Sequence, residues 1–109
     1  ALETTARFDF TKTWSGGMVG TSRGVMLSGG DPQQGEAGYV AIEVFNGSVD
    51  GLQGSLALQQ FGTMHSGDYV LRYEIVPGSC TGELTGIVGS VDLTIADGLH
   101  RVTLRYKRT

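Results

Sequence analysis

Hydrophobic and polar residues alternate in short runs along most of the chain. Val40, Ile42 and Val44 occupy every second position of the stretch 39–45, and Phe8 and Phe10 do so in 7–14. A period of two is typical of a β-strand, because successive side chains point to opposite faces of a sheet. Further runs rich in β-branched and aromatic residues are Val19–Leu27, Ser55–Phe61, Tyr69–Val76, Val91–Ile95 and Val102–Tyr106. The pattern predicts seven or eight antiparallel strands, of which Val19–Leu27 is the weakest because Gly24 interrupts it.

Glycine spacing favours the same fold class. The chain has 18 glycines among 109 residues, and a glycine inside a helix costs about 1 kcal/mol relative to alanine. Asp97-Gly98 is a hairpin signal between the last two runs, and Ser28–Gly38 reads as a polar, mobile loop that could cover a barrel mouth. We therefore predict an all-β fold with little or no helix: an antiparallel, closed or nearly closed β-barrel of about eight strands.

Length and charge narrow the class of protein. The chain has the size of one domain, 1–109, with a formal net charge of -3. An acidic chain lacks the basic face that nucleic-acid binding needs, so no nucleic-acid partner is expected. Cys80 is the only cysteine, which excludes an intramolecular disulfide. With no signal-peptide pattern and no long apolar run, we expect a cytoplasmic protein without a membrane partner.

Two stretches, 46–58 and 81–93, repeat one glycine pattern. Gly47, Gly51 and Gly54 of the first align with glycines 82, 86 and 89 of the second. Glycine permits positive φ angles and close approach of backbones. We interpret the repeat as a corner used twice, in which Leu52 or Ile87 plugs an end of the core.

A family resemblance rests on two motifs. Leu58-Gln59-Gln60-Phe61-Gly62-Thr63 is followed by Val76-Pro77-Gly78-Ser79-Cys80-Thr81-Gly82-Glu83-Leu84-Thr85-Gly86-Ile87-Val88-Gly89. Both resemble a bacterial family known as domain of unknown function 3224. Gln60 stands where that family usually has histidine, and Cys80 where it usually has glycine. The resemblance implies a fold like the allene oxide cyclase barrel, whose relatives hold apolar molecules and guide their cyclisation or coupling.

Motifs for cofactor, metal or covalent catalysis are absent from the sequence. No nucleophile elbow, phosphate-binding loop or zinc-binding helix motif occurs. His65 and His100 both fall in predicted turns and read as exposed histidines, so neither a metal site nor a cofactor is expected. Cys80 has no visible base beside it, so it reads as a turn residue.

Three carboxylates fall on predicted strands or corners: Glu43, Glu74 and Glu83. Two carboxylates in a partly dry cavity could serve as acid and base, which makes Glu43 and Glu83 the catalytic candidates. The alternative is that each is solvated or paired with Arg72 or Arg105.

Glu43 is the strongest single candidate, because it shares a strand face with Tyr39 and Phe45. An aromatic face with one carboxylate is typical of a ligand lumen, although the aliphatic opposite face could equally form the core and leave Glu43 in solvent. If Glu43 is buried without a partner, its pKa is raised. The predicted ligand-binding residues are Tyr39, Glu43, Gln60 and Tyr73.

Three functions fit these patterns. The first is a barrel that binds a small apolar or amphipathic molecule. The second is a cofactor-free isomerase or cyclase that works by confinement. The third is a structural or interaction domain with a filled barrel. A homo-oligomer is compatible with all three.

Overall fold

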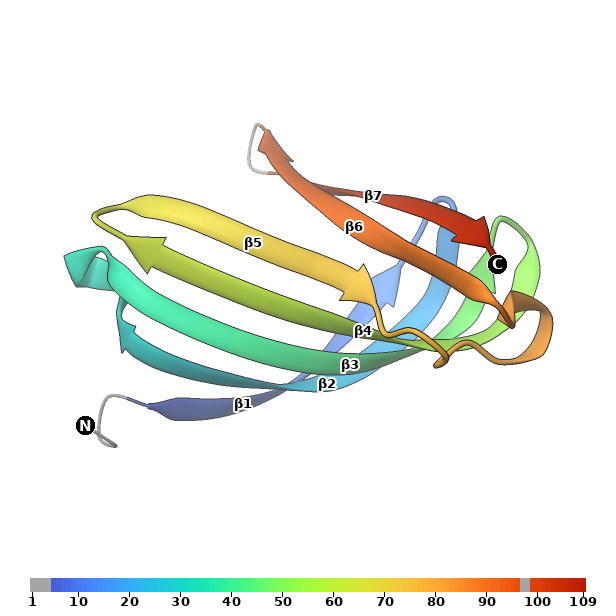
Figure 1. The fold of residues 1–109 in the computed structure, drawn as a ribbon, viewed down its shortest axis with the longest axis horizontal. Helices are drawn as coiled ribbons and strands as arrows, with labels where there is room; N and C mark the ends of the chain where they lie inside the picture. Colours follow the sequence, from blue (N-terminus) through green and yellow to red (C-terminus); the bar gives the residue numbers. More distant parts are fainter. Residues whose placement is uncertain (1–4, 97–98) are drawn as a thin grey trace.

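The computed structural model describes residues 5–96 and 99–109, and these residues form one seven-stranded antiparallel sheet (Figure 1). Two short 3-10 turns, η2 (Pro32–Gln34) and η3 (Gly82–Leu84), are the only helical elements in this part of the chain. No helix there has the length and hydropathy needed to span a bilayer. The strands are β1 (Ala6–Trp14), β2 (Met18–Asp31), β3 (Glu36–Val49), β4 (Leu52–His65), β5 (Asp68–Ile75), β6 (Ile87–Ala96) and β7 (Leu99–Arg108). The predicted all-β class is confirmed.

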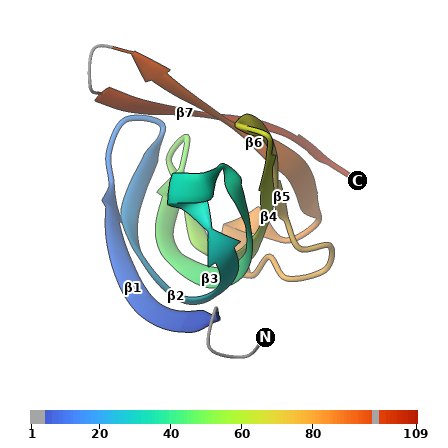
Figure 2. The same cartoon turned by 90° about the vertical axis from the view of Figure 1, so that its left-hand side faces the viewer.

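The sheet curls into a trough. Strands β1 to β5 curve around an interior, and the β6–β7 hairpin crosses over the trough near one end (Figures 1 and 2). Neighbours in the sheet follow chain order from β1 to β7. Within residues 5–96 and 99–109, the edge strands β1 and β7 are not hydrogen-bonded to each other, so closure into a barrel is not confirmed. The predicted Asp97-Gly98 turn lies outside the described residues, but the strands that flank it are paired.

The predicted loop at 28–38 is wrong. β2 continues to Asp31 and β3 begins at Glu36, so that most of this segment is paired strand. The turn itself is the short η2, where the Asp31 carboxylate accepts a hydrogen bond of 3.0 Å from the Gln33 backbone N–H. Gly35 ends η2 with a φ of 75°, in the left-handed region that favours glycine. Glycine-rich sequence hid the strands, because Gly29 faces Gly38 and neither contributes to the hydrophobic alternation.

Several strand glycines lie opposite aromatic residues. Phe10 pairs with Gly24 and Tyr39 with Gly62 in the strand register. A Cβ on Gly62 would lie 2.4 Å from Cε1 of Tyr39, so the Tyr39 ring covers the glycine. Gly24, which the sequence pattern treats as an interruption of β2, likewise leaves room for the Phe10 ring. Covering a strand glycine with an aromatic ring is a known way of stabilising a sheet.

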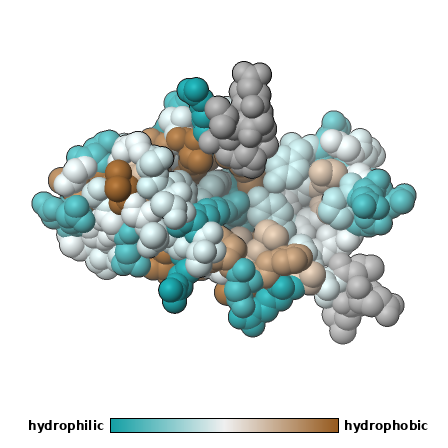
Figure 3. All heavy atoms as spheres, turned by 180° about the vertical axis from the view of Figure 1, so that it is seen from behind, coloured by the Kyte–Doolittle hydropathy of each residue, from teal (hydrophilic) through white to brown (hydrophobic). Residues whose placement is uncertain are grey.

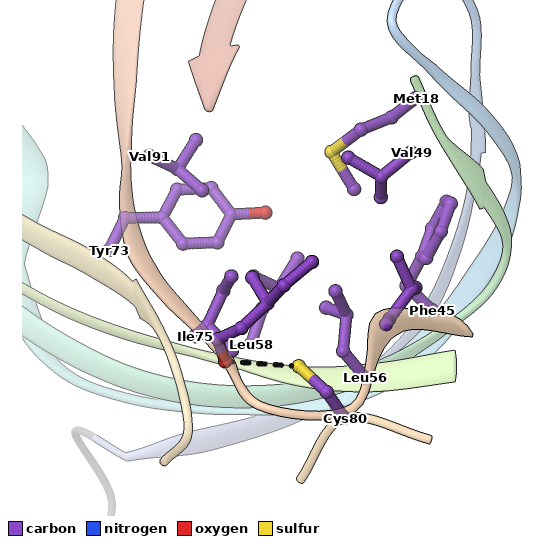
Figure 4. Close-up of a cluster of buried hydrophobic side chains, with 11 residues drawn as sticks. Met18, Phe45, Val49, Leu56, Leu58, Tyr73, Ile75, Cys80 and Val91 are labelled. Atoms are coloured by element: carbon purple, nitrogen blue, oxygen red, sulfur yellow. Dashed lines mark hydrogen bonds between the residues drawn. The ribbon is translucent and has the colours of Figure 1, made fainter. Parts of the chain in front are cut away.

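A hydrophobic core fills one end of the trough (Figure 4). Side chains of Phe45, Leu56, Leu58 and Ile75 point toward one another from β3, β4 and β5. Trp14 adds an edge-to-face contact with Phe45, with ring centroids 6.0 Å apart. The Cys80 thiol donates a hydrogen bond of 3.3 Å to the Ile87 carbonyl across this cluster.

The two copies of the glycine pattern have different structures, so the predicted repeated corner is only partly right. The first copy is the hairpin between β3 and β4, whereas the second is η3 and the start of β6. Gly51 and Gly86 do share positive φ angles of 84° and 87°. The copies also pack together, since Thr81 N–H donates to the Ser55 carbonyl at 2.8 Å. Of the two predicted plugs, Ile87 is buried and Leu52 only partly so.

Candidate functional site

The interior of the trough divides into a packed end and an open end. Inward-facing residues of β1 to β5 form rows across the strands, and Glu43 lies in a row with Phe10, Gly24, Leu58 and Ile75. From this row toward the β3–β4 turn, β3 to β5 contribute buried hydrophobic side chains, whereas β1 and β2 contribute Lys12 and Ser22. Toward η2, apolar residues such as Met26 share the rows with Gln60 and Tyr39. Glu43 therefore lies at the boundary between the two.

Glu43 is the centre of a hydrogen-bond network on the inner face. Its side chain is 1% exposed, and Oε2 accepts a bond of 2.6 Å from the Ser22 hydroxyl. Oε1 accepts from the Tyr73 hydroxyl at 2.6 Å, from Lys12 Nζ at 3.1 Å and from Gln60 Nε2 at 3.3 Å. The face of Glu43 is thus the inner one, and the aliphatic face of β3 is the outer one. The premise of a buried Glu43 without a partner is wrong.

The network continues from Glu43 toward the open end. Gln60 accepts a hydrogen bond of 3.0 Å from the Tyr39 hydroxyl, which itself accepts one of 3.2 Å from Tyr69. Among the described residues, no buried side-chain nitrogen or oxygen lacks a partner. A continuous path of polar contacts therefore joins the buried carboxylate to the exposed Tyr69.

Lys12 provides the positive charge beside Glu43. Its ammonium lies 5.1 Å from the ring centre of Phe10, 5.8 Å from that of Trp14 and 5.4 Å from that of Tyr73. These separations are within the range of cation–π attraction. The Lys12 side chain is 38% exposed, whereas the Glu43 side chain with which it forms an ion pair of 3.1 Å is buried.

Both inner tyrosines are held as neutral phenols. Burial raises the pKa of Tyr73 above its usual value, and the hydrogen bond to Glu43 raises it further. Burial also raises the pKa of Tyr39, with an added contribution from the hydrogen bond with Tyr69. A neutral phenol can donate a hydrogen bond, so both hydroxyls serve as donors near neutral pH.

A pocket of about 370 Å³ opens on the inner face at the η2 end. Its walls are mainly apolar and come from β1 to β5 and from η2. The side chains that shape it include those of Phe8, Met26, Pro32, Tyr39, Met64 and Tyr69. The Tyr39 side chain belongs both to the pocket wall and to the network that leads to Glu43.

The other catalytic candidate, Glu83, is not brought together with Glu43. Glu83 lies in η3, is exposed, and accepts a hydrogen bond of 2.9 Å from the Gln53 backbone N–H. Glu74 lies on the outer face, where it accepts a bond of 3.1 Å from the Gln59 side chain. A pair of carboxylates acting as acid and base is therefore not formed by these residues.

The remaining titratable candidates belong to the surface or the core. His65 Nδ1 lies 2.7 Å from the Glu36 carboxylate, which lowers the pKa of Glu36. The His100 side chain lies outside what the structure describes. Burial raises the pKa of the Cys80 thiol, which disfavours a nucleophilic thiolate. The described residues include no cluster of three or more potential metal ligands.

The sequence reasoning missed Lys12 and Ser22, which bond to Glu43, and Trp14, whose Nε1 donates a hydrogen bond of 3.0 Å to the Ser22 hydroxyl. Lys12 and Trp14 continue the alternation of Phe8 and Phe10, so they share the inward face of β1. A lysine on an otherwise aromatic strand face was the available signal.

Comparison with known proteins assigns the chain to a family. The family described as "Protein of unknown function (DUF3224)" matches residues 2–106. The chain belongs to the DUF3224 family. This DUF3224 protein is also similar to the crystal structure of a protein with unknown function from the same family, from Shewanella oneidensis MR-1. The two share 40% sequence identity over 96% of this chain and 78% of that one, with a TM-score of 0.91. No curated protein matches the chain.

The comparisons confirm the family resemblance. They do not confirm the predicted similarity to the allene oxide cyclase barrel. Gln60, which stands where DUF3224 sequences were expected to carry histidine, contacts Glu43 directly at 3.3 Å.

Proposed function

We propose that this DUF3224 protein binds a small apolar or amphipathic molecule in the pocket at the η2 end of the trough. The observation that carries the proposal is the combination of an apolar pocket and a hydroxyl-bearing wall. Small-molecule sites are typically concave and apolar, with a few polar groups that fix the orientation of the ligand. Tyr39 and Tyr69 supply these polar groups.

The ligand chemistry follows from the available donors. The hydroxyls of Tyr39 and Tyr69 bond to each other at 3.2 Å, and a ligand carbonyl or hydroxyl can replace that exchangeable contact. The apolar part of the ligand would contact Phe8, Met26 and Met64. Because Glu43 already accepts four hydrogen bonds, it orients the polar wall rather than receiving the ligand directly.

A cofactor-free isomerase or cyclase is the second candidate, and a specific contact favours it. The Tyr73 hydroxyl and Lys12 Nζ lie 2.6 Å and 3.1 Å from Oε1 of Glu43, within the reach for moving a proton to or from a carboxylate. Such a reaction would confine an apolar substrate in the manner of allene oxide cyclase-like barrels, and it would require closure of the trough around the substrate. The third hypothesis, a structural or interaction domain whose interior is filled by side chains, agrees with the packed end of the trough but not with its open end.

Fluorescence titration with 8-anilinonaphthalene-1-sulfonate, an apolar probe with an anionic group, tests binding. Ala37→Phe places a ring on the inner face beside Tyr39 and should abolish binding in the pocket. Val70→Phe is the matched control, because it adds the same ring to an exposed strand position outside the pocket. Near-ultraviolet circular dichroism checks that both variants keep the native packing around Trp14. Equal probe affinity in Ala37→Phe and the native protein would refute the proposal.

A further inference from the structure

The hydrogen bonds that join Glu43 to the pocket all run in one direction. A carboxylate only accepts, so the Gln60 side chain turns Nε2 toward Glu43 and donates to it at 3.3 Å. The carbonyl oxygen of the Gln60 amide then faces Tyr39 and accepts a bond of 3.0 Å from its hydroxyl. The Tyr39 oxygen in turn accepts a bond of 3.2 Å from Tyr69. We call these four residues the polar path.

The direction of the polar path decides what the two tyrosines offer to a ligand. A phenol hydroxyl has one proton to donate. Tyr39 gives its proton to Gln60 and Tyr69 gives its proton to Tyr39. Both tyrosines line the pocket of about 370 Å³ at the η2 end, and Tyr69, which is 54% exposed, ends the path there. With the path intact, the pair therefore presents lone pairs that accept hydrogen bonds and no free donor.

We propose that the pocket selects an amphipathic ligand whose polar head donates a hydrogen bond, a primary alcohol or amine. This inference rests on the proposed function and names the ligand class. A donor head adds a bond to the tyrosine oxygens without breaking the polar path. A ketone only accepts, so it must take the proton of Tyr69 and break the 3.2 Å bond to Tyr39. One hydrogen bond gained without a loss corresponds to about tenfold in affinity.

Gln60 controls this preference from outside the pocket. Its side chain bonds to Tyr39 on one side and to Glu43 on the other, and it is not part of the pocket wall. Without the Gln60 carbonyl oxygen, the Tyr39 hydroxyl loses the acceptor of its proton, and that proton becomes available to a ligand. Gln60 is therefore a positioning residue, because it acts on the ligand through the Tyr39 hydroxyl.

Two other hydroxyl residues, Ser28 and Thr63, also border the pocket. Ser28 is the neighbour of Tyr39 on β2, whereas the Tyr39 ring lies over Gly62, its neighbour on β4. In the described part of the chain, neither hydroxyl is hydrogen-bonded to the polar path. A free hydroxyl can donate as well as accept, so these two residues add to the binding of an alcohol and of a ketone alike.

Titration of the native protein with 1-octanol, octylammonium and 2-octanone, followed by NMR of the methionine methyl groups, measures the preference. Met26 and Met64 line the pocket, whereas Met18 lies in the core and serves as the internal control. Hydrophobic side chains also form separate groups on the surface seen from behind (Figure 3), so the dissociation constants are taken from the Met26 and Met64 signals alone.

The better of the two donor ligands should bind about tenfold more tightly than 2-octanone, and the tighter of the two tells whether the head is an alcohol or an amine. Equal dissociation constants for all three ligands overturn this inference and leave the proposed function standing. If none of the three shifts Met26 or Met64, the inference and the proposed function both fall.

Substitution of Gln60 tests the direction of the polar path. Gln60→Met frees the Tyr39 proton and should tighten the binding of 2-octanone about tenfold, while 1-octanol changes by less than about threefold. Gln59→Met is the matched control, because the Gln59 side chain bonds to Glu74 on the outer face. An unchanged preference in Gln60→Met, with a native near-ultraviolet circular dichroism spectrum, overturns the proposal.

The other wall hydroxyls provide a second comparison. Ser28→Ala and Thr63→Val each remove a pocket hydroxyl without touching the polar path, so the ratio of the 2-octanone and 1-octanol dissociation constants should stay within about threefold of the native value. Loss of the preference in either variant would assign it to that hydroxyl and overturn the role of the polar path.

Discussion

The Tyr73 hydroxyl offers the cleanest measure of what the Glu43 network contributes to stability. Tyr73→Phe removes one oxygen atom, which donates a 2.6 Å hydrogen bond to Glu43 and accepts a long one of 3.4 Å from Lys12. The ring, 6% exposed and packed beside Val91 (Figure 4), keeps its contacts. A hydrogen bond to a charged group contributes about 1.5–3 kcal/mol. Since Glu43 retains three other donors, we expect a loss of about 2 kcal/mol in the free energy of unfolding.

Urea denaturation followed by Trp14 fluorescence measures this loss, and a thermal scan should show a midpoint lower by roughly 8 °C in a domain of this size. Tyr69→Phe is the control. Tyr69 is 54% exposed, and within the described part of the chain its hydroxyl bonds only to Tyr39, so its removal should change stability by less than about 0.5 kcal/mol. If Tyr73→Phe is no more destabilising than Tyr69→Phe, the buried carboxylate does not depend on the network as we describe it.

Three further outcomes follow from the geometry. Gly62→Ala places a methyl group 2.4 Å from Cε1 of the Tyr39 ring and should lower the free energy of unfolding, measured by urea denaturation, by about 1–3 kcal/mol. An unchanged urea midpoint would show that the ring does not cover Gly62. Gly51→Val and Gly86→Val put β-branched residues at φ angles of 84° and 87° and should each cost about 1–3 kcal/mol, whereas two native-like midpoints would contradict the turn geometry. The raised pKa values of Tyr39 and Tyr73 mean that the folded state retains protons that the unfolded state loses near pH 10, the usual tyrosine value. Their stabilising contribution is therefore complete below pH 10 and is lost as the pH rises above it; phenolate absorbance that titrates all tyrosines together near pH 10 in the folded protein would argue against burial.

The alternation of residues predicted the strands but not which face of the central strand is the interior. In 39–45, one face carries Tyr39, Glu43 and Phe45, and the other carries Val40, Ile42 and Val44. By hydropathy alone, the aliphatic face is the better core. The structure buries the other face because its cross-strand neighbours supply the partners that Glu43 needs. Those neighbours come from residues 12, 22 and 73, so no local window of sequence could reveal them.

Glycine caused the other errors. It was counted as a strand breaker, which shortened the predicted second strand and converted the 28–38 hairpin into a loop. In the sheet, glycine at an inward position instead gives space to the aromatic ring opposite, as Gly24 does for Phe10. Such a pairing becomes visible only when the register is known. The family motifs, in contrast, were recognisable directly, and the match over residues 2–106 confirms them.

The division of the interior and the exposure of the aliphatic side chains Val40, Ile42 and Val44 on the outer face have a common origin in the composition of β3. A small domain has enough apolar surface for one core, and here that core occupies only the end of the trough covered by the β6–β7 hairpin. The aliphatic side chains of β3 that would have extended it point outward, and tyrosine, glutamate and alanine point inward in their place. The inner face thus has a polar network beside a pocket in place of further hydrophobic burial, and the outer face keeps exposed apolar side chains such as Ile42. The choice of the inner face of β3 therefore accounts both for the polar network beside the pocket and for the exposed aliphatic side chains on the outer face.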